Sequence, residues 1–447
     1  MTTTFLATPP AWPVILLGRT KAIAAEPWDL DTAVRAGAFE GLKAAVRTGA
    51  TGTIAEVGAS GLRGRGGAGH PTGDKWRAAA SNPADQRYVI ANGYGADPAT
   101  QIDSALLAAD PWSVIEGLVI AAFAVGASEA YLIVRGDDTE LVSRLEAAVA
   151  DAEEAGFSGD DVAGSGHRVD VIVRGLQGSY MLGEETVLIR ALEGRRAAPD
   201  QRPPYPTERG LWDRPTVVNN VVTLAAVPWI LTHGAQAFAA IGTRDAPGTA
   251  LVQLRGPGGA GIAEVPLGAS LADITSLVGG AGAHTLKALV VGGPTGGFLP
   301  ATALDTPYTF AAIRDAGAHV GSGSIVIADE RACIVDLARL LTRFSADQAC
   351  GKSIPCRIGL RRLSEIADRA TEGTTRAGDA QLADDLAHDI AASALCDHER
   401  TATLALSSVL RYFRSELDDH LLRSTCPAGV CTPIAVAGGA ASRGASA

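Results

Sequence analysis

Two short apolar runs flank a long apolar segment in the first third of the chain, and this order limits the folds the chain can adopt. Residues 87–91 (RYVIA) and 131–135 (YLIVR) are rich in β-branched and aromatic residues and are closely followed by glycine, as buried strands are. Between them, residues 111–125 have the length and apolar density of a packed helix. A helix at 138–155 and a strand at 169–173 extend the pattern, which predicts a parallel α/β unit.

The pattern changes twice further along the chain. Residues 249–305 alternate short strands with glycine turns, and residues from 345 onward read as helices that hold five of the six cysteines. A chain of 447 residues also exceeds what one hydrophobic core usually supports. We therefore predict an α/β domain at 1–245, a small β-rich domain at 246–335, a helical domain at 336–434 and a disordered tail at 435–447. The Pro- and Arg-rich segment 193–214 is predicted to wrap the surface of the first domain.

Charge and hydropathy exclude two classes of protein. The 38 Lys and Arg against 49 Asp and Glu give a net charge of −11, which repels a phosphate backbone, so no nucleic-acid partner is expected. The strongest apolar stretch, 118–127, is far shorter than the roughly 20 residues of a spanning helix. The first residues carry no basic segment before their apolar run, so we expect a cytoplasmic protein that is not embedded in a membrane.

A dense glycine run, GLRGRGGAGHPTGDKW (61–76), is the first candidate site. Its glycines lack a β-carbon and let backbone N–H groups approach a phosphate or a flat ring, while Arg63, Arg65 and Lys75 add positive charge. The run is neither a G-x-G-x-x-G motif placed after a strand nor a Walker loop. A flexible connector is therefore the alternative.

Two further segments carry paired polar residues. In GSYMLGEETVLIRALEG (178–194), Glu184 and Glu185 precede a helix, where they either cap it or accept hydrogen bonds from ribose or amide donors. In PTVVNNVVTL (215–224), Asn219 and Asn220 either form a turn or offer the donors and acceptors that a polar ring or phosphate requires. The residues alone leave both alternatives open for each pair.

The cysteines form another candidate site, since all six lie in the last third of the chain. Cys350 and Cys356 share a turn with Gly and Pro, Cys396 follows, and Cys426 and Cys431 enclose CPAGVC. In a reducing compartment such a group suggests metal binding before disulfides. Iron–sulfur ligation fits these turns, with structural zinc and buried inert cysteines as the alternatives.

Taken together, these segments resemble the NADH-binding flavoprotein subunit of bacterial respiratory complex I and its relatives in NAD-linked hydrogenases and formate dehydrogenases. GLRGRGGAGHPTGDKW resembles the glycine loop of that family, GSYMLGEET its flavin segment, and RPPYPTERGLWDRPTVVNNVVTL the stretch that follows. VPLGASLADI and GSGSIVIADE resemble its β-rich module and the exit from that module, and ACGKSIPCRIG and VLRYFRSELDDH its cluster domain. The resemblance spans Leu30 to Cys431 in order.

The resemblance implies an α/β FMN-binding domain, then a small β-rich, β-grasp-like domain and a C-terminal helical iron–sulfur domain. It implies FMN with NADH stacked against it, and one [4Fe–4S] cluster that takes electrons singly from the reduced flavin. The residues implied for the flavin and dinucleotide site are Gly64, Arg65, Gly66, Gly67, Ala68, Gly69, His70, Lys75, Asn92, Asp97, Tyr180, Gly183, Glu184, Glu185, Asn219, Asn220 and Thr223. The implied cluster ligands are Cys350, Cys356 and Cys396, with Ser353 where the family has its middle cysteine.

Several positions depart from the family pattern. Serine is a harder donor than thiolate, so we expect a cluster that is either serine-ligated or short of an iron. In NGYGADPATQIDS (92–104), Tyr94 and Gly95 stand where the family has an Asp and a Glu, which bears on NADH affinity and specificity. His70 replaces a Phe and either stacks on adenine or lies in a surface turn.

For the three remaining cysteines the sequence favours a structural role over ligand binding, and Cys333 is an alternative cluster ligand only if the fold brings it near the others. Cys333 lies in a largely hydrophobic run and is predicted to be an inert core residue. Cys426 and Cys431 are predicted to have an unpaired structural role.

We predict an electron-transfer subunit that oxidises NADH through FMN and passes single electrons through the cluster to a separate iron–sulfur subunit or ferredoxin. Any attachment to a membrane complex is expected to run through a partner. No catalytic acid or base is expected, because hydride transfer depends on stacking and distance. The alternative, motivated by Tyr94, Gly95 and Ser353, is a divergent relative that keeps the fold, with or without FMN, as a binding or scaffold subunit without NADH oxidation. A third option is electron flow from a reduced ferredoxin to the flavin.

Overall fold

A four-stranded parallel sheet organises the first part of the chain in the computed structural model, which describes residues 4–431. The strand order is β3-β2-β1-β4, and all three pairings are parallel. The strands are β1 (Tyr88–Asn92), β2 (Glu129–Arg135), β3 (Asp170–Leu176) and β4 (Thr216–Asn220). The predicted strands at 87–91, 131–135 and 169–173 are confirmed with shifted ends.

Helix α6 (Pro111–Val125) forms the centre of this module and is confirmed to the residue. Asp110 caps its first turn by accepting a hydrogen bond from the N–H of Ser113, and Pro111 takes the first helical position, where it needs no N–H partner. Gly126 ends the helix in the left-handed region, at φ 74°. The helix is buried on nearly every side. It therefore packs between the sheet and neighbouring helices rather than lying on the surface.

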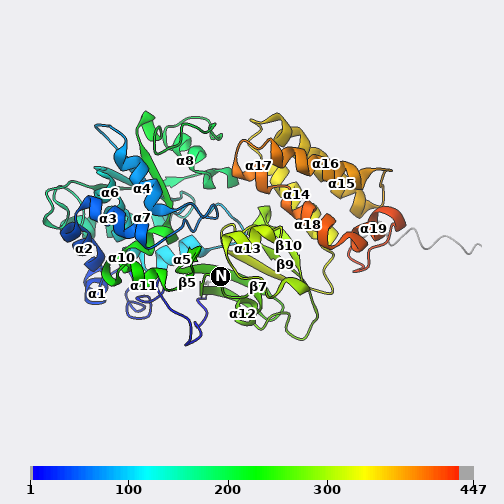
Figure 1. Cartoon of the computed structure of the whole chain (residues 1–447), viewed down its shortest axis with the longest axis horizontal. Helices are drawn as coiled ribbons and strands as arrows, with labels where there is room; N and C mark the ends of the chain where they lie inside the picture. The colour runs from blue at the N-terminus through cyan, green and yellow to red at the C-terminus, as the bar shows by residue number, and fades with distance from the viewer. Residues whose placement is uncertain (1–3, 432–447) are drawn as a thin grey trace, which may run out of the picture.

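Ten more helices accompany the four strands, which makes the module a mixed α/β structure (Figure 1). They are α1 (Leu30–Arg35), α2 (Glu40–Thr48), α3 (Ala50–Ala59), α4 (Thr72–Ser81), α5 (Ile102–Ala109), α7 (Thr139–Glu154), α8 (Glu185–Leu192), α9 (Val221–Ala225), α10 (Val227–His233) and α11 (Ala235–Ala239). Helix α7 confirms the helix predicted at 138–155.

A second, five-stranded sheet of order β10-β9-β11-β7-β8 follows. Only β7 (Thr249–Gly256) and β11 (Ser324–Asp329) pair in parallel, and the others, β8 (Gly259–Pro266), β9 (Leu286–Val291) and β10 (Gly297–Pro300), pair antiparallel. Two short helices, α12 (Leu271–Ser276) and α13 (Phe310–Asp315), accompany this sheet, and a small ribbon of β5 (Gly242–Thr243) and β6 (Ala246–Pro247) precedes it. The prediction of short strands between 249 and 305 is confirmed.

The N-terminal segment crosses from the first module to the second sheet. Phe5 forms a β-bridge with Ile262, and the carboxylate of Glu264 accepts hydrogen bonds from the N–H groups of Ile15, Leu16 and Leu17 at 2.8–2.9 Å. The start of the chain therefore helps to hold the second sheet against the first module.

Helices fill the rest of the described chain, at the end of the molecule opposite α1–α3 (Figure 1). They are α14 (Ile334–Gln348), α15 (Leu360–Glu372), α16 (Asp379–Ala392), α17 (Asp397–Thr401), α18 (Leu404–Tyr412) and α19 (Arg414–Arg423), with a π-helical turn at Pro355–Gly359. Helix α14 begins earlier than the residue 345 from which we predicted helices. The predicted domain boundaries stay predictions, and the predicted tail at 435–447 lies outside the described residues.

Among residues 4–431, no single helix is long and apolar enough to cross a membrane. Helices α5 and α6 reach the length and apolar composition of a membrane span only when they are taken together. The chain bends by 98° between them.

Candidate cofactor cavity and cysteine sites

A cavity of about 900 Å³ lies at the carboxyl ends of β1 and β4. These two strands are neighbours, whereas the chain proceeds from β1 to β2 and β3 on the other side, so the strand order reverses between β1 and β4. In open parallel sheets, ligands bind in the crevice at this reversal point. Asn92 and Asn220, the last residues of the two strands, pair in register there.

The cavity brings together the segments that the sequence singled out. Of the residues predicted for the flavin and dinucleotide site, all except Gly67 and Thr223 line it: Gly64, Arg65, Gly66, Ala68, Gly69, His70, Lys75, Asn92, Asp97, Tyr180, Gly183, Glu184, Glu185, Asn219 and Asn220. Its volume lies near the upper end of the roughly 300–1,000 Å³ of typical small-molecule sites. The cavity therefore suits a large cofactor together with part of a second ligand.

Two glycines of the loop allow close contact with the second module. Gly67 has φ +109°, and a β-carbon on it would lie 2.9 Å from the carbonyl oxygen of Gly321. Gly69 has φ +63°, and a β-carbon there would lie 2.8 Å from the ring of Phe310. The loop is therefore a shaped element held against its neighbours, and the flexible-connector alternative is wrong.

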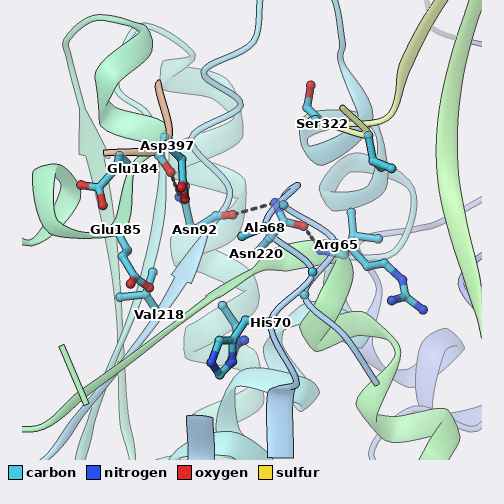
Figure 2. Close-up of a pocket in the computed structure, with 18 of the residues that line it drawn as sticks. Arg65, Ala68, His70, Asn92, Glu184, Glu185, Val218, Asn220, Ser322 and Asp397 are labelled. Atoms are coloured by element: carbon cyan, nitrogen blue, oxygen red, sulfur yellow. Dashed lines mark hydrogen bonds between the residues drawn. The ribbon is translucent and has the colours of Figure 1, made fainter. Parts of the chain in front are cut away.

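The side chain of Arg65 serves this packing and not the cavity charge that we predicted. Its guanidinium donates hydrogen bonds to the carbonyl oxygens of Arg63, Pro247 and Thr249 at 2.7–2.8 Å. Figure 2 shows it directed away from Asn92 and Glu184. Burial lowers the pKa of Arg65 to about 10. Thr223 lies behind the loop, where its hydroxyl accepts a hydrogen bond from the backbone N–H of Arg65 at 2.8 Å.

Two carboxylates and two cations form a network on one wall. Glu184 caps α8 by accepting hydrogen bonds from the N–H groups of Thr186 and Val187, both at 2.9 Å, and it also pairs with Arg202. Glu185 lies 2.9 Å from Lys75 and 3.2 Å from Arg202. Burial raises the pKa of Glu184, whereas for Glu185 the nearby Lys75 and Arg202 outweigh burial and lower the pKa. The helix-capping alternative is therefore confirmed for Glu184, and hydrogen bonding of the pair to a ligand stays a prediction.

Lys75 connects this wall of the cavity to β4. Its ammonium group donates to Glu185 and, at 3.0 Å, to the carbonyl oxygen of Val218. These two partners, Glu185 and Val218, lie on the same side of the cavity in Figure 2.

Amide side chains and buried acids form the floor of the cavity. The side-chain amide of Asn220 donates to the carbonyl oxygen of Asn92 at 3.2 Å and to the carboxylate of Asp103 at 3.1 Å. Burial raises the pKa of Asp103 to about 6. Asp97 accepts hydrogen bonds from the N–H of Ala99 at 2.7 Å and from the hydroxyl of Ser322, and burial raises its pKa too. The segment 92–104 therefore supplies two carboxylates to the cavity, Asp97 and Asp103, despite Tyr94 and Gly95.

The two substituted positions of this segment lie in different surroundings. Gly95 lines the cavity at φ +58°, with nothing within 4 Å of a β-carbon built on it. Tyr94 is buried among Met181, Leu182 and Val187, and its hydroxyl donates to the carbonyl oxygen of Gly178 at 2.8 Å. Of these two positions, only Gly95 has open space beside it. His70 is exposed at the edge of the cavity, with Nδ1 3.0 Å from the carbonyl oxygen of Pro71.

The three predicted cluster cysteines gather beside the cavity. Cys350 and Cys396 pack against the same apolar group as Tyr94, and Cys356 lies on the π-helical turn. Burial raises the pKa of Cys356 to about 12 and that of Cys396 to about 11. Asp397, His398 and Thr401, which follow Cys396, line the cavity itself. This proximity and the sulfur donors fit an iron–sulfur cluster close to a bound flavin.

Ser353 lies between Cys350 and Cys356 in the sequence, just before the π-helical turn. Its hydroxyl donates a hydrogen bond of 2.7 Å to Glu399, whose other oxygen accepts from the N–H of Leu395 at 2.8 Å. Glu399 is buried. The serine is therefore fixed by a carboxylate on the turn that carries Cys350 and Cys356.

The other three cysteines form a separate group, which the sequence interpretation missed. Cys333, Cys426 and Cys431 meet His420, and their ligand atoms all lie within 4.8 Å of one another. Cys333 is buried, as predicted, but it is not an isolated core residue, and Cys426 and Cys431 are not without partners. No local motif marks His420, which lies 87 residues from Cys333 in the sequence.

Other cavity residues also escaped the sequence interpretation. Arg202 comes from the segment 193–214, which was predicted only to wrap the surface, and Ser322 and His319 come from the loop before β11. Asp397 comes from the helical module. These residues come from three segments that lie far apart in the sequence, so no local spacing predicts that they meet at the cavity.

Comparison with known proteins agrees with this geometry. Residues 57–229 match the family described as the Nuo51 FMN-binding domain, and residues 336–420 match the NADH-ubiquinone oxidoreductase-F iron–sulfur binding region. The chain is 38% identical to the HndC subunit of the NADP-reducing hydrogenase of Solidesulfovibrio fructosivorans, over 92% of this chain and 84% of that one. The chain belongs to the family of NADH-binding flavoprotein subunits.

Further relatives agree with this assignment. A subunit of the NADH-quinone oxidoreductase of Streptomyces coelicolor is 37% identical over 90% of both chains. A crystal structure of an NAD⁺-reducing [NiFe]-hydrogenase in the H₂-reduced state superposes with a TM-score of 0.81 at 30% identity, covering 94% of this chain and 68% of that one. This member of the family is an NADH-oxidising FMN flavoprotein subunit with an iron–sulfur region. Its relatives are subunits of multi-subunit complexes.

Proposed function

We propose that the cavity at the carboxyl ends of β1 and β4 holds FMN with NADH against it, and that the cysteine group beside it passes the electrons on singly. One observation carries this proposal: Cys396 directly precedes Asp397 and His398, which line the cavity, so the two cofactor sites share a wall. FMN supplies the chemistry, because it accepts a hydride as two electrons and releases them one at a time.

In this proposal the residues of the chain bind and orient FMN and NADH. Backbone N–H groups of the loop from Gly66 to Gly69 and the ammonium of Lys75 are suited to an anionic phosphate. Asn92, Asn219 and Asn220 supply amide donors and acceptors at the strand ends. The remaining predicted residues, His70, Asp97, Tyr180, Gly183, Glu184 and Glu185, complete the walls. None of these roles needs a general acid or base.

Tyr180 links the cavity to the helical module. Its hydroxyl lies 3.0 Å from that of Thr295, while its ring meets Phe344 and His398 edge-on, with centroids 5.3 and 5.7 Å apart. We assign it a positioning role, since it holds the cavity wall against α14 and α17.

For the cluster we propose Cys350, Cys356 and Cys396 as ligands, with Ser353 at the fourth position. Exposed apolar side chains flank this turn: Ile354 is 62% exposed and Ile358 is 50% exposed. Such residues beside a cluster are suited to the docking of an electron acceptor. We propose a separate iron–sulfur subunit or ferredoxin in that role, in the cytoplasm, with any membrane complex reached through it.

The test is an anaerobic titration of the purified chain with NADH, followed by electron paramagnetic resonance. We expect bleaching of the flavin absorbance and then a cluster signal. A chain that holds FMN but is bleached by neither NADH nor NADPH contradicts NADH oxidation and supports the scaffold function, which the open space at Gly95 and the serine at 353 favour.

A further inference from the structure

The second cysteine group has the dimensions of a tetrahedral metal site. His420 Nε2 lies 3.4 Å from the sulfur of Cys333 and 3.5 Å from that of Cys431, and these two sulfurs are 3.7 Å apart. A tetrahedral zinc ion with bonds of about 2.3 Å to sulfur and about 2.0–2.1 Å to nitrogen separates two sulfurs by about 3.8 Å, and sulfur from nitrogen by about 3.5 Å. The observed edges agree with these values. Cys426 completes the set within 4.8 Å.

The position of Cys333 at the start of a helix favours metal binding. The sulfur of Cys333 caps α14 and accepts the N–H of Asp336 at 3.4 Å, so a thiolate there faces the positive end of a helix. Hydrogen bonds of this kind stabilise the thiolates that a metal requires.

His420 is oriented as metal-binding histidines are. Its Nδ1 lies 2.8 Å from the carbonyl oxygen of Glu416, which fixes the proton on Nδ1 and leaves the Nε2 lone pair facing the sulfurs. His420 is fully buried, although no carboxylate oxygen lies within hydrogen-bond distance of its ring. The Nε2 lone pair and the sulfurs of Cys333 and Cys431 therefore face a common point, as the ligands of one metal ion do.

Two other chemistries fit the geometry less well. A disulfide joins sulfurs about 2.05 Å apart and would leave the histidine unused. In an iron–sulfur cube the ligand sulfurs attach to different irons and lie further apart than these do. Three thiolates and one imidazole in a closed tetrahedron are a structural zinc set.

We propose that Cys333, His420, Cys426 and Cys431 bind one structural Zn²⁺. The ion would join residues 87 and 98 positions apart: the start of α14, the last turn of α19 and the C-terminal end of the described chain. None of the four residues lines the cofactor cavity. The zinc therefore holds the helical module together at its junction with β11 and takes no part in electron transfer.

The experiment measures zinc and iron in the full-length chain after removal of any affinity tag. We expect one zinc per chain by plasma mass spectrometry, with three sulfurs and one nitrogen in the zinc X-ray absorption spectrum. His420→Ala and the double variant Cys426→Ser/Cys431→Ser should lose the zinc and keep FMN. His388→Ala, which removes an exposed histidine of α16, should keep it. Cys350→Ser should lose iron and retain zinc, which separates this site from the proposed cluster.

Cobalt provides a second readout should the variants fail to fold. When the parent chain is loaded with Co²⁺ in place of zinc, it should show the intense visible bands of tetrahedral cobalt and the thiolate charge-transfer bands. Iron in place of zinc, an unfilled site in the folded parent chain, or zinc retained by the folded double variant would each overturn the proposal.

Discussion

Ser353 is the residue whose chemistry most affects the proposed cluster. Its hydroxyl is held by the buried carboxylate of Glu399, 2.7 Å away. We expect Ser353→Cys to raise the iron content and to change a three-iron resonance signal into a four-iron one, because a thiolate is a softer and better iron ligand than a hydroxyl. Iron analysis and electron paramagnetic resonance of the dithionite-reduced protein check this.

Ser353→Ala is the matched control for that change. It removes the hydroxyl without supplying sulfur, so it should not gain iron. Identical spectra for the parent, the Ala variant and the Cys variant would show that position 353 is not a ligand.

Lys75 is an ion-paired cation on the cavity wall. It pairs with Glu185 at 2.9 Å, and both side chains are about four-fifths buried. Lys75→Met leaves Glu185 with Arg202 alone and removes the ammonium from the expected phosphate position. Losing a hydrogen bond to a charged group costs about 1.5–3 kcal/mol, so FMN should bind roughly 10- to 100-fold more weakly. Flavin fluorescence titration measures this, with Lys43→Met on the exposed face of α2 as the control.

Among the elements, α6 contains a buried acid, Glu116, whose protonation affects stability. Glu116 is fully buried, accepts a hydrogen bond from the N–H of Leu42 at 3.0 Å, and has Arg19 only at 4.0 Å. Burial, partly offset by Arg19, raises its pKa from 4.5 to about 7. Because the folded state holds this proton more tightly, the stabilisation is complete below about pH 4.5 and is lost as the pH rises through about 7.

Glu116→Gln should remove this pH dependence. The amide stays neutral, so the variant should gain stability relative to the parent as the pH rises from about 5 to about 8, by up to about 3 kcal/mol. Thermal unfolding midpoints across this range measure the difference. For Glu146→Gln, at an exposed position of α7, the unfolding midpoint should change with pH as it does in the parent. A constant offset between Glu116→Gln and the parent would refute the argument.

Helix α6 also shows which elements the sequence can predict. Its ends follow from Asp110, Pro111 and Gly126, and each of these affects only residues close to it in the sequence. The local sequence pattern is therefore sufficient to predict this helix. Arg202 and His420 are different, because each acquires its role only when the fold brings it to Glu184 or to Cys333. The family resemblance placed the glycine loop, Asn220 and Cys396 together, but it said nothing about these long-range contacts.

At the scale of the whole molecule, the cavity is built where all three modules meet. The glycine loop and the strand ends come from the parallel sheet, Tyr308 and Ser322 from the second module, and Asp397 from the helices. The site therefore depends on the modules keeping their relative positions. Arg65 is buried between the first two modules and connects them by donating hydrogen bonds to the carbonyl oxygens of Pro247 and Thr249.

Arg65→Met should loosen that junction. The methionine fills similar space but leaves three carbonyl oxygens without their donor, which costs about 3 kcal/mol or more. We expect a lower thermal midpoint, faster hydrogen exchange at residues 247–250 and in the glycine loop, and a reduced FMN content. Arg144→Met, an exposed change on α7, should alter none of these. Unchanged exchange at both segments in Arg65→Met would mean that the modules are held together without this residue, and that the start of the chain, through Glu264, carries the connection.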